Sequence, residues 1–450
     1  MNKIKLSERQ IHAGIIALLL LPPIITAIFI ALFGVNVIYW DQWDFFAGTL
    51  SHWYTGSLSF QDLFSQHNEH RIFFPRLVMI GLATLTSYNN LAEMVCSYLL
   101  LLLILVLIYR IFTLGKQWTW KYLMFFIPVA WLICSLDQYE NLLWGFQIQI
   151  FLCVTGILIA ILFLEQCKGT DWDLAVGIFG GILSSFSFMN GLMVWPAGLV
   201  LLLLKENRSS RAISAWLVAA IVTTLVFFDG WVRQESLPSL FYFIAKPVDA
   251  ISYFLVIIAN SSGFSPGIIG DNAAIFVAVI FLLILCFVLY RAYVAGIIRT
   301  NAGIVALIVF PLLSEVMLTV GRGGFGIGQA ISPRYITFTV FGIIGLYILF
   351  VNLREYCKDD LWVKRVYYFF CLLVLAGIIL GMMNGLVQGE KTKEQRLVIR
   401  ENLISYQTVP DSAFKNLYPD PKVIREWAPV LKKYQLNVFA GNNTLSWIKF

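Results

Sequence analysis

Long apolar runs alternate with short polar connections over most of the chain. The runs are continuous rather than alternating in polarity, which is typical of helices that cross a membrane. Two apolar stretches, 72–88 and 247–261, are ambiguous, because each could span or lie at the surface. Eleven other runs are predicted to span: 11–33, 91–113, 121–136, 148–165, 174–190, 191–204, 212–229, 272–290, 302–320, 333–351 and 366–387.

The positions of Lys and Arg decide how the ambiguous stretches are placed, since cytoplasmic loops carry an excess of positive charge. If both stretches are in-plane or re-entrant on the exterior face, the cytoplasmic segments carry 16 Lys and Arg residues. The exterior segments apart from the tail then carry six. This arrangement predicts a cytoplasmic N-terminus, about eleven transmembrane helices and an exterior C-terminus.

A change in composition divides the chain after residue 387. The segment 388–450 holds 16 charged residues, whereas the much longer part before it holds 42. We therefore predict a transmembrane domain at 1–387, with a long first exterior loop at 34–90. The segment 388–450 is predicted to be a small soluble exterior cap with short helices and proline-marked turns.

The overall composition narrows the class of protein. Hydrophobic residues make up 59% of the chain and charged residues 13%, about half the roughly 25% of a soluble domain. This excludes an ordinary soluble enzyme and a disordered chain. The net charge of +6 follows from the cytoplasmic loops and does not indicate a nucleic-acid partner. The seven cysteines show no CxxC spacing, so neither a disulfide framework nor a zinc site is expected.

The first exterior loop concentrates polar side chains. It holds three of the four histidines, among interleaved aromatic residues such as Trp43. Asp41 and Asp44 stand three residues apart, so on a helical turn they share a face. Two close carboxylates suit a shared metal ion, a general base with a hydrogen-bond acceptor, or a pair of helix caps. An interfacial aromatic belt with solvated charges is the alternative interpretation of the whole loop.

Farther along this loop runs the sequence His67-Asn68-Glu69-His70-Arg71. It does not match HExxH, and its two histidines stand three apart, so it gives no specific signal for zinc. Binding of substrate hydroxyls or pairing with a phosphate suits these side chains better.

A glycine-rich cluster occupies residues 321–326 and continues to Arg334. Its spacing fits GxGxxG, but it follows an apolar span rather than a strand and faces the exterior, where no dinucleotide pool exists. Backbone amides together with Arg322 and Arg334 suit an anion instead. An ordinary flexible hairpin is the alternative.

Two smaller features are predicted on or near the same face. The polar loop 137–141, which contains Tyr139 and Glu140, leads into a span. Glu315 lies inside another span, where a carboxylate indicates either a functional group or a structural pair. The polar side chains of the chain therefore gather on one face, which favours an anionic lipid phosphate together with a sugar as ligands.

These residues resemble the GT-C superfamily of polytopic glycosyltransferases. The WDQWD stretch, Trp40 to Asp44, lies where that superfamily carries its catalytic first-loop acid, although two residues separate the aspartates instead of the DxD or DD spacing. In-plane helices after this loop, here 72–88, are also typical of it. The chain looks like the serotype-converting O-antigen glucosyltransferases of bacteria and their phages. The architectural resemblance covers the whole chain, and the motifs cover 36–76 and 321–335.

The resemblance implies a transferase of the bacterial inner membrane that acts on the periplasmic face. Its donor would be a polyprenyl-phosphate-linked sugar, and its acceptor a glycan such as an O-antigen repeat of lipopolysaccharide. Asp44 or Asp41 would be the base of an inverting displacement. The donor phosphate would be bound by Arg322, Arg334 and Arg71. Sugar and acceptor would be bound by His67, Glu69, His70, Trp43, Tyr139 and Glu140. The sequence leaves open whether Mg²⁺ or Mn²⁺ takes part.

Two other classes of membrane protein compete with this interpretation. A flippase or transporter of a lipid-linked sugar predicts polar residues throughout the spans and on both faces, whereas here they gather on one. A membrane acyltransferase predicts a histidine inside the membrane next to an acid. The only histidine near a span is His12, at the predicted cytoplasmic edge.

Overall fold

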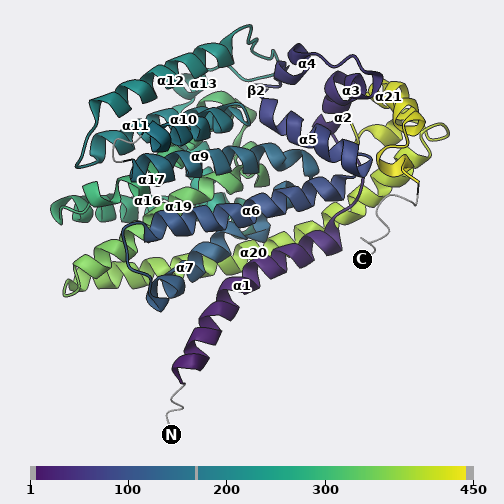
Figure 1. Ribbon diagram of the computed structural model, residues 1–450. Helices are drawn as coiled ribbons and strands as arrows, with labels where there is room; N and C mark the ends of the chain where they lie inside the picture. The colour runs from purple at the N-terminus through teal and green to yellow at the C-terminus, as the bar shows by residue number, and fades with distance from the viewer. Residues whose placement is uncertain (1–6, 168–170, 442–450) are drawn as a thin grey trace, which may run out of the picture.

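The computed structural model describes residues 7–167 and 171–441. Its long helices lie side by side in one bundle (Figure 1). Within the described residues, nine helices are long and apolar enough to cross a membrane. They are built on α1 (Glu8–Phe33), α6 (Asn90–Thr113), α7 (Trp120–Ile133), α9 (Ile148–Gln166), α12 (Ser210–Phe228), α16 (Asp271–Val294), α17 (Ala302–Arg322), α19 (Pro333–Tyr356) and α20 (Leu361–Ile404). The prediction of an all-α, multi-pass membrane protein is confirmed at this level.

The predicted spans 174–190 and 191–204 are not among these nine helices of the described residues. They form α10 (Asp171–Ser185) and α11 (Val194–Leu204), which η4 (Met189–Met193) joins into a helical hairpin. At 1.5 Å per residue the two helices extend roughly 22 and 17 Å, less than the ~30 Å hydrocarbon core of a bilayer. The total of eleven transmembrane helices therefore stays a prediction.

The two ambiguous stretches also form short helices. They are α5 (Phe73–Thr86) and α14 (Pro247–Ser261). α14 packs against α16, α17 and α19, and its second half is buried. It therefore enters the bundle, as a re-entrant helix would, while α5 contacts α6 and α9.

The helix α20 crosses the predicted domain boundary without a break. It has 44 residues, and Asp360 caps its start by accepting the backbone N–H groups of Trp362 and Val363. Residues 388–404, predicted to belong to a separate cap, continue this helix beyond the bundle (Figure 1). Glycines at four-residue intervals form a stripe along α20 that touches other elements closely: Gly377, Gly381, Gly385 and Gly389.

The first exterior loop and the tail form one layer with its own hydrophobic core. Buried side chains from both parts, such as Trp43, Phe46, Leu417 and Leu431, belong to this core. Figure 1 shows the yellow tail next to α2 and α3. The loop contributes α2 (Asp41–Phe45), η1 (Phe46–Leu50), α3 (Ser51–Thr55), α4 (Phe60–Phe64), β1 (Gln66–His67) and β2 (His70–Arg71). The tail contributes η7 (Asp411–Phe414), α21 (Pro421–Lys433) and η8 (Asn437–Phe439).

Backbone contacts fix the tail to the loop. The Trp40 N–H donates to the Leu417 carbonyl at 3.0 Å, and the Asn437 N–H donates to the Ser87 carbonyl at 2.8 Å. The Asn437 side chain also accepts the Ile38 N–H at 3.2 Å. The loop and the tail, assigned to different units by composition, are therefore one structural layer.

The remaining elements are short connections. They are η2 (Leu136–Gln138), α8 (Tyr139–Leu142), η3 (Gly145–Gln147), α13 (Tyr242–Ala245), α15 (Pro266–Ile269), η5 (Arg299–Asn301), η6 (Gly323–Phe325) and α18 (Ile327–Ala330).

Candidate active site

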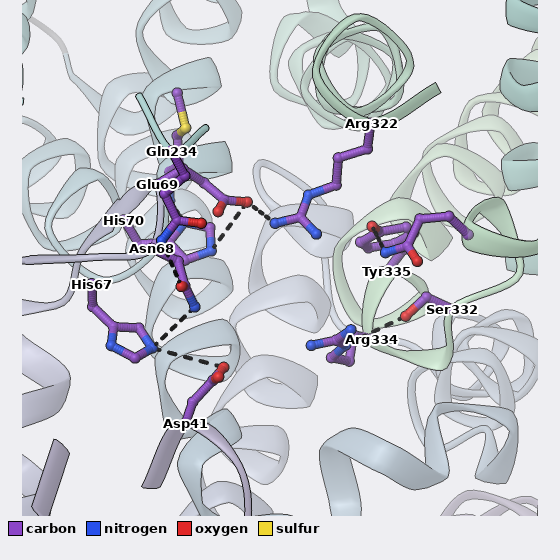
Figure 2. A network of polar contacts seen from close by, with 12 residues as sticks. Asp41, His67, Asn68, Glu69, His70, Gln234, Arg322, Ser332, Arg334 and Tyr335 are labelled. Carbon is purple, nitrogen blue, oxygen red and sulfur yellow. Dashed lines mark hydrogen bonds and ion pairs between the residues drawn. The ribbon is translucent and has the colours of Figure 1, made fainter. Parts of the chain in front are cut away.

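A polar cavity of about 370 Å³ lies where the first exterior loop meets the ends of α9, α17 and α19. Its polar walls combine three carboxylates, two arginines and several amides, and aromatic rings complete them. The charged and amide residues are Asp41, Glu69, Glu140, Arg322, Arg334, Asn68, Gln147, Gln149, Asn190 and Gln234. The aromatic residues are Tyr39, Trp40, Trp144, Phe188, Phe325 and Tyr335. Figure 2 shows the two main walls facing each other.

Asp41 is the predicted catalytic aspartate that faces this cavity. It is the first residue of α2, and its Oδ2 lies 3.7 Å from Nε2 of the buried His67. Burial alone would raise the pKa of Asp41, but the hydrogen bond and charge of His67, with Arg334 nearby, outweigh burial and lower it below the ordinary 3.8. Asp41 is therefore ionised at neutral pH.

The hairpin β1–β2 presents Glu69 and His70 to the cavity. The turn between the strands places Asn68 in a left-handed conformation, with φ of 49°. Glu69 forms an ion pair with Arg322 of α17, and its Oε1 lies 3.7 Å from Nε2 of His70 (Figure 2). The hairpin and α17 are thereby joined across the cavity.

His70 is held as a neutral ring. Its Nδ1 accepts the Met189 N–H at 3.2 Å, which leaves the ring proton on Nε2, facing Glu69. The ring stacks on Phe188 with centroids 4.0 Å apart. Burial lowers the pKa of His70 to about 3, so it acts as a hydrogen-bonding group rather than as a cation.

The opposite wall is built at the start of α19. Arg334 Nε lies 3.6 Å from Oε1 of Glu140 and donates to Ser332 Oγ at 3.4 Å. The hydroxyl of Tyr335 accepts the Gln329 amide at 3.0 Å. The predicted binding residues Glu140 and Arg334 are thus brought together at the cavity. Arg334 lies across the cavity from Asp41 (Figure 2).

Asp44, the other predicted base, does not line the cavity. It is exposed and accepts a hydrogen bond of 2.6 Å from the Tyr418 hydroxyl of the tail. Desolvation of the carboxylate by the surrounding protein raises the pKa of Asp44, and the hydrogen bond from Tyr418 opposes the rise only in part. The helical turn that puts Asp41 at the cavity therefore turns Asp44 toward the tail.

Three further predicted residues lie away from the cavity. Trp43 is fully buried in the core of the exterior layer. The Arg71 guanidinium donates to the carbonyls of Phe64, Phe227 and Asp229, so it holds the loop to the end of α12. Tyr139 packs against the core of the bundle. The predicted roles of Trp43, Tyr139 and Arg71 in ligand binding are therefore not supported by their positions.

Several residues that border the site were not predicted as binding groups. Gln147 and Gln149 line the cavity, and each has a buried side-chain oxygen with no hydrogen-bond partner among the described residues. Arg396 of α20 places its guanidinium 3.1 Å from the centroid of the Tyr39 ring. A pair of glutamines at the start of an apolar run was a usable signal, whereas the position of Arg396 depends on the unbroken α20.

A second, largely apolar cavity of about 430 Å³ adjoins the polar one. Both are lined by Glu69, Asn190, Leu237, Leu318 and Arg322. The apolar side chains that line only the second cavity are Met189, Phe228, Trp231, Leu240, Met317 and Val320. Phe228 and Leu240 are also exposed on the outside of the bundle. The Arg322–Glu69 pair thus stands between a polar chamber and an apolar groove.

The donor set offers no clear metal centre. No group of three or more His, Cys, Asp and Glu side chains that could hold a metal ion occurs within residues 7–167 and 171–441. Glu69 and Glu140 are each paired with an arginine, and Asp41 with His67.

Comparison of the chain with family models, with curated proteins and with solved structures gives no match.

Proposed function

We propose that the protein is an integral-membrane glycosyltransferase. It moves a sugar from a polyprenyl-phosphate donor to a lipid-linked or O-antigen glycan on the periplasmic face of the bacterial inner membrane. The resemblance to serotype-converting glucosyltransferases implies that the sugar is glucose. The observation that carries the proposal is the junction of the two cavities at Arg322 and Glu69. An isoprenoid phosphate sugar has the same order of parts: an apolar chain, an anion and a polar ring.

This order of surfaces supports one orientation of the donor. Its isoprenoid chain lies in the apolar groove beside Trp231 and Leu318, where burial of apolar area stabilises it. Its phosphate meets Arg322, whose guanidinium can bind two oxygens at once. Its sugar enters the polar chamber, where the free oxygens of Gln147 and Gln149 accept hydroxyl donors and aromatic faces pack against the ring.

Asp41 is the proposed base. The acceptor hydroxyl attacks the anomeric carbon from the face opposite the phosphate, and its proton passes to the Asp41 carboxylate. The new glycosidic bond forms as the bond from the anomeric carbon to the phosphate oxygen breaks, and the electron pair leaves with the phosphate. Arg322 stabilises the charge that develops there. His67 orients Asp41 and keeps it ionised before transfer.

The test is the mass of the surface polysaccharide repeat unit in a host that makes the acceptor. We expect the intact gene to add one sugar residue to the repeat. Asp41→Asn should abolish this addition, because loss of a general base lowers the rate by about 10²–10⁴-fold. Asp44→Asn is the matched control, since it changes the same side chain on the same helix outside the cavity and should retain transfer.

The other outcomes separate the alternatives. Transfer that persists in Asp41→Asn and disappears in Asp44→Asn would contradict the assignment of the base. A repeat unit of unchanged mass in every strain, with wild-type protein present in the membrane, would contradict glycosyl transfer to this glycan. A changed amount of lipid-linked sugar at the outer face without transfer would favour the flippase.

A further inference from the structure

A second polar cavity lies at the other end of the same helices that build the candidate active site. It has a volume of about 220 Å³ and lies where the last turns of α6, α9 and α19 meet the start of α17. On α19, Arg334 faces the active site and Asn352 faces this cavity. Their separation of 18 positions corresponds to roughly 27 Å along the helix. The two cavities are thus separated by about the thickness of a bilayer core.

Lys116 supplies a cation to this cavity. Its Nζ donates to Asn352 Oδ1 at 2.8 Å and lies 4.4 Å from the ring centroid of Phe112. Among the described residues no carboxylate lies within ion-pair distance of Lys116, and the nearby Glu355 pairs with Lys121. Burial lowers the pKa of Lys116 to about 8, because the ammonium is desolvated without a counter-ion in contact.

Glu165 supplies an anion to the same cavity. It lies in the last turn of α9, and its Oε2 is buried with no hydrogen-bond partner in the described part of the chain. The Nζ of the neighbouring Lys205 donates to the carbonyls of Leu164, Glu165 and Cys167 and forms no ion pair with the carboxylate. The charge of Lys205 and the backbone N–H of Gly303 stabilise the carboxylate in part, and its Oε2 stays without a partner among the described residues. A buried carboxylate oxygen without a partner is costly, so it indicates a ligand that donates hydrogen bonds.

We propose that this cavity binds the head group of a glycerophospholipid that carries both a phosphate and a primary ammonium. The phosphate accepts hydrogen bonds from Lys116, and the ammonium donates to Glu165. The two charged side chains face one cavity without pairing with each other, which is the arrangement a zwitterion satisfies. Asn301 and Asn352, joined by a hydrogen bond of 2.6 Å, line the cavity with them.

The surroundings favour a membrane lipid over a soluble zwitterion. The cavity sits at the ends of membrane-length helices, and apolar side chains of Ile111, Phe112, Leu114 and Ile304 also line it. These side chains offer contact to the glycerol and the first carbons of the acyl chains. In the predicted topology this end of the bundle faces the cytoplasmic leaflet.

The chemistry also predicts which head groups are rejected. A choline head group has a quaternary nitrogen with no N–H to give to Glu165. A glycerol head group has hydroxyl donors but no cation, so the negative charge of the carboxylate stays unpaired. The site therefore distinguishes phosphatidylethanolamine from phosphatidylcholine and phosphatidylglycerol, although all three have the same phosphate.

The test uses the purified full-length protein, delipidated in detergent and titrated with the three dioleoyl lipids in native mass spectrometry. We expect phosphatidylethanolamine to bind at least tenfold more tightly than the other two lipids, because each of them lacks the charged hydrogen bond to Glu165 and the loss of one such bond lowers affinity by about that factor. Glu165→Gln and Lys116→Gln should each reduce its binding by about tenfold. Lys121→Gln is the matched control, because Lys121 lies nearby in the chain but pairs with Glu355 outside the cavity.

The comparison of head groups on the wild-type protein keeps the test valid even if a variant fails to fold. Equal binding of all three lipids would overturn the proposal and leave a hydrated crevice. Equal binding of phosphatidylethanolamine and phosphatidylglycerol, with dependence on Lys116 alone, would also overturn it, because the site would then select an anion. None of these results depends on sugar transfer.

Discussion

Asp41 and Asp44 carry the same side chain on one helical turn, and their surroundings give them different properties. Asp41 faces the polar cavity and contacts His67, which lowers its pKa despite burial. Asp44 is turned toward Tyr418 in the tail, and partial desolvation of its carboxylate raises its pKa. Spacing in the sequence identifies the pair, but the choice between them follows from the neighbours that folding brings.

His67 should control the pH dependence of the proposed reaction. Asp41 has a pKa below its ordinary value, so its ionised form is present at neutral pH and is lost only as the pH falls through that lowered pKa. In His67→Asn the main opposing interaction is removed, and burial raises the pKa. We expect the acidic limb of the kcat/KM profile to move to higher pH in this variant.

A second histidine of the same loop provides the control for this measurement. His52 lies 3.2 Å from Asp62, and neither residue lines the cavity. His52→Asn should leave the profile unchanged. An acidic limb that stays in place in His67→Asn would contradict Asp41 as the group whose ionisation limits the rate.

At the scale of elements, the tail holds α2 in position. The Trp40 N–H donates to the Leu417 carbonyl, and Trp40 has a φ of 47°, a left-handed conformation that is strained for a tryptophan. Tyr418, which follows Leu417 in the tail, donates a hydrogen bond from its hydroxyl to Asp44 of α2. Two contacts on consecutive tail residues thus fix the turn that directs Asp41 into the cavity.

Removing one of these contacts should loosen α2. Tyr418→Phe deletes the hydroxyl that donates to Asp44, and we expect a loss of about 1 kcal/mol in stability, as for one net hydrogen bond. Transfer activity should fall more than for the control Tyr434→Phe, whose ring packs against Tyr54. Thermal unfolding in detergent and the repeat-unit assay measure the two effects. Equal activity in both variants would contradict a positioning role for Tyr418.

The glycine stripe of α20 allows close helix packing. A Cβ at Gly385 would lie 2.3 Å from the carbonyl carbon of Leu136, and backbone cannot yield as a side chain does. We expect Gly385→Ala to destabilise the protein by roughly 1–3 kcal/mol, the cost of overpacking. Gly14→Ala in α1 is the control, because nothing lies within 4 Å of a Cβ there. Thermal unfolding in detergent should separate the two variants.

At the scale of the whole molecule, the predicted sidedness does not depend on the uncertain spans. α10 and α11 form one hairpin, so counting both or neither leaves an odd number of crossings. Either count puts the two ends of the chain on opposite sides of the membrane. The excess of Lys and Arg then predicts that the connection after α11 is cytoplasmic and that the tail is exterior.

Labelling of introduced cysteines measures this sidedness. Asn207 lies in the connection after α11 and Ser412 in the tail, and both are exposed. We expect a membrane-impermeant maleimide to label Ser412→Cys on intact spheroplasts and Asn207→Cys only after permeabilisation. The unsubstituted protein gives the background of its seven native cysteines. The reverse pattern would contradict a periplasmic active site.

The sequence by itself determined the helical class, nine of the eleven predicted spans and the wealth of polar groups in the first loop. These properties depend on local composition, because about twenty consecutive apolar residues are enough to indicate a span. Clusters of polar side chains in the sequence also identified six residues that the structure brings to one cavity. They are Asp41, Glu69, His70, Glu140, Arg322 and Arg334.

Only the tertiary structure decided which of the predicted groups meet. The Glu69–Arg322 pair joins residues 253 positions apart, and the tail reaches back 374 positions to contact Asp44. Trp43 and Arg71 are residue types that are common in binding sites. In the structure Trp43 is buried in the core of the exterior layer, and Arg71 holds the loop to the end of α12. Whether a side chain lines the cavity or packs in a core depends on which helices are neighbours. The arrangement of the helices follows from the close packing of the whole bundle, which the local pattern of one sequence does not specify.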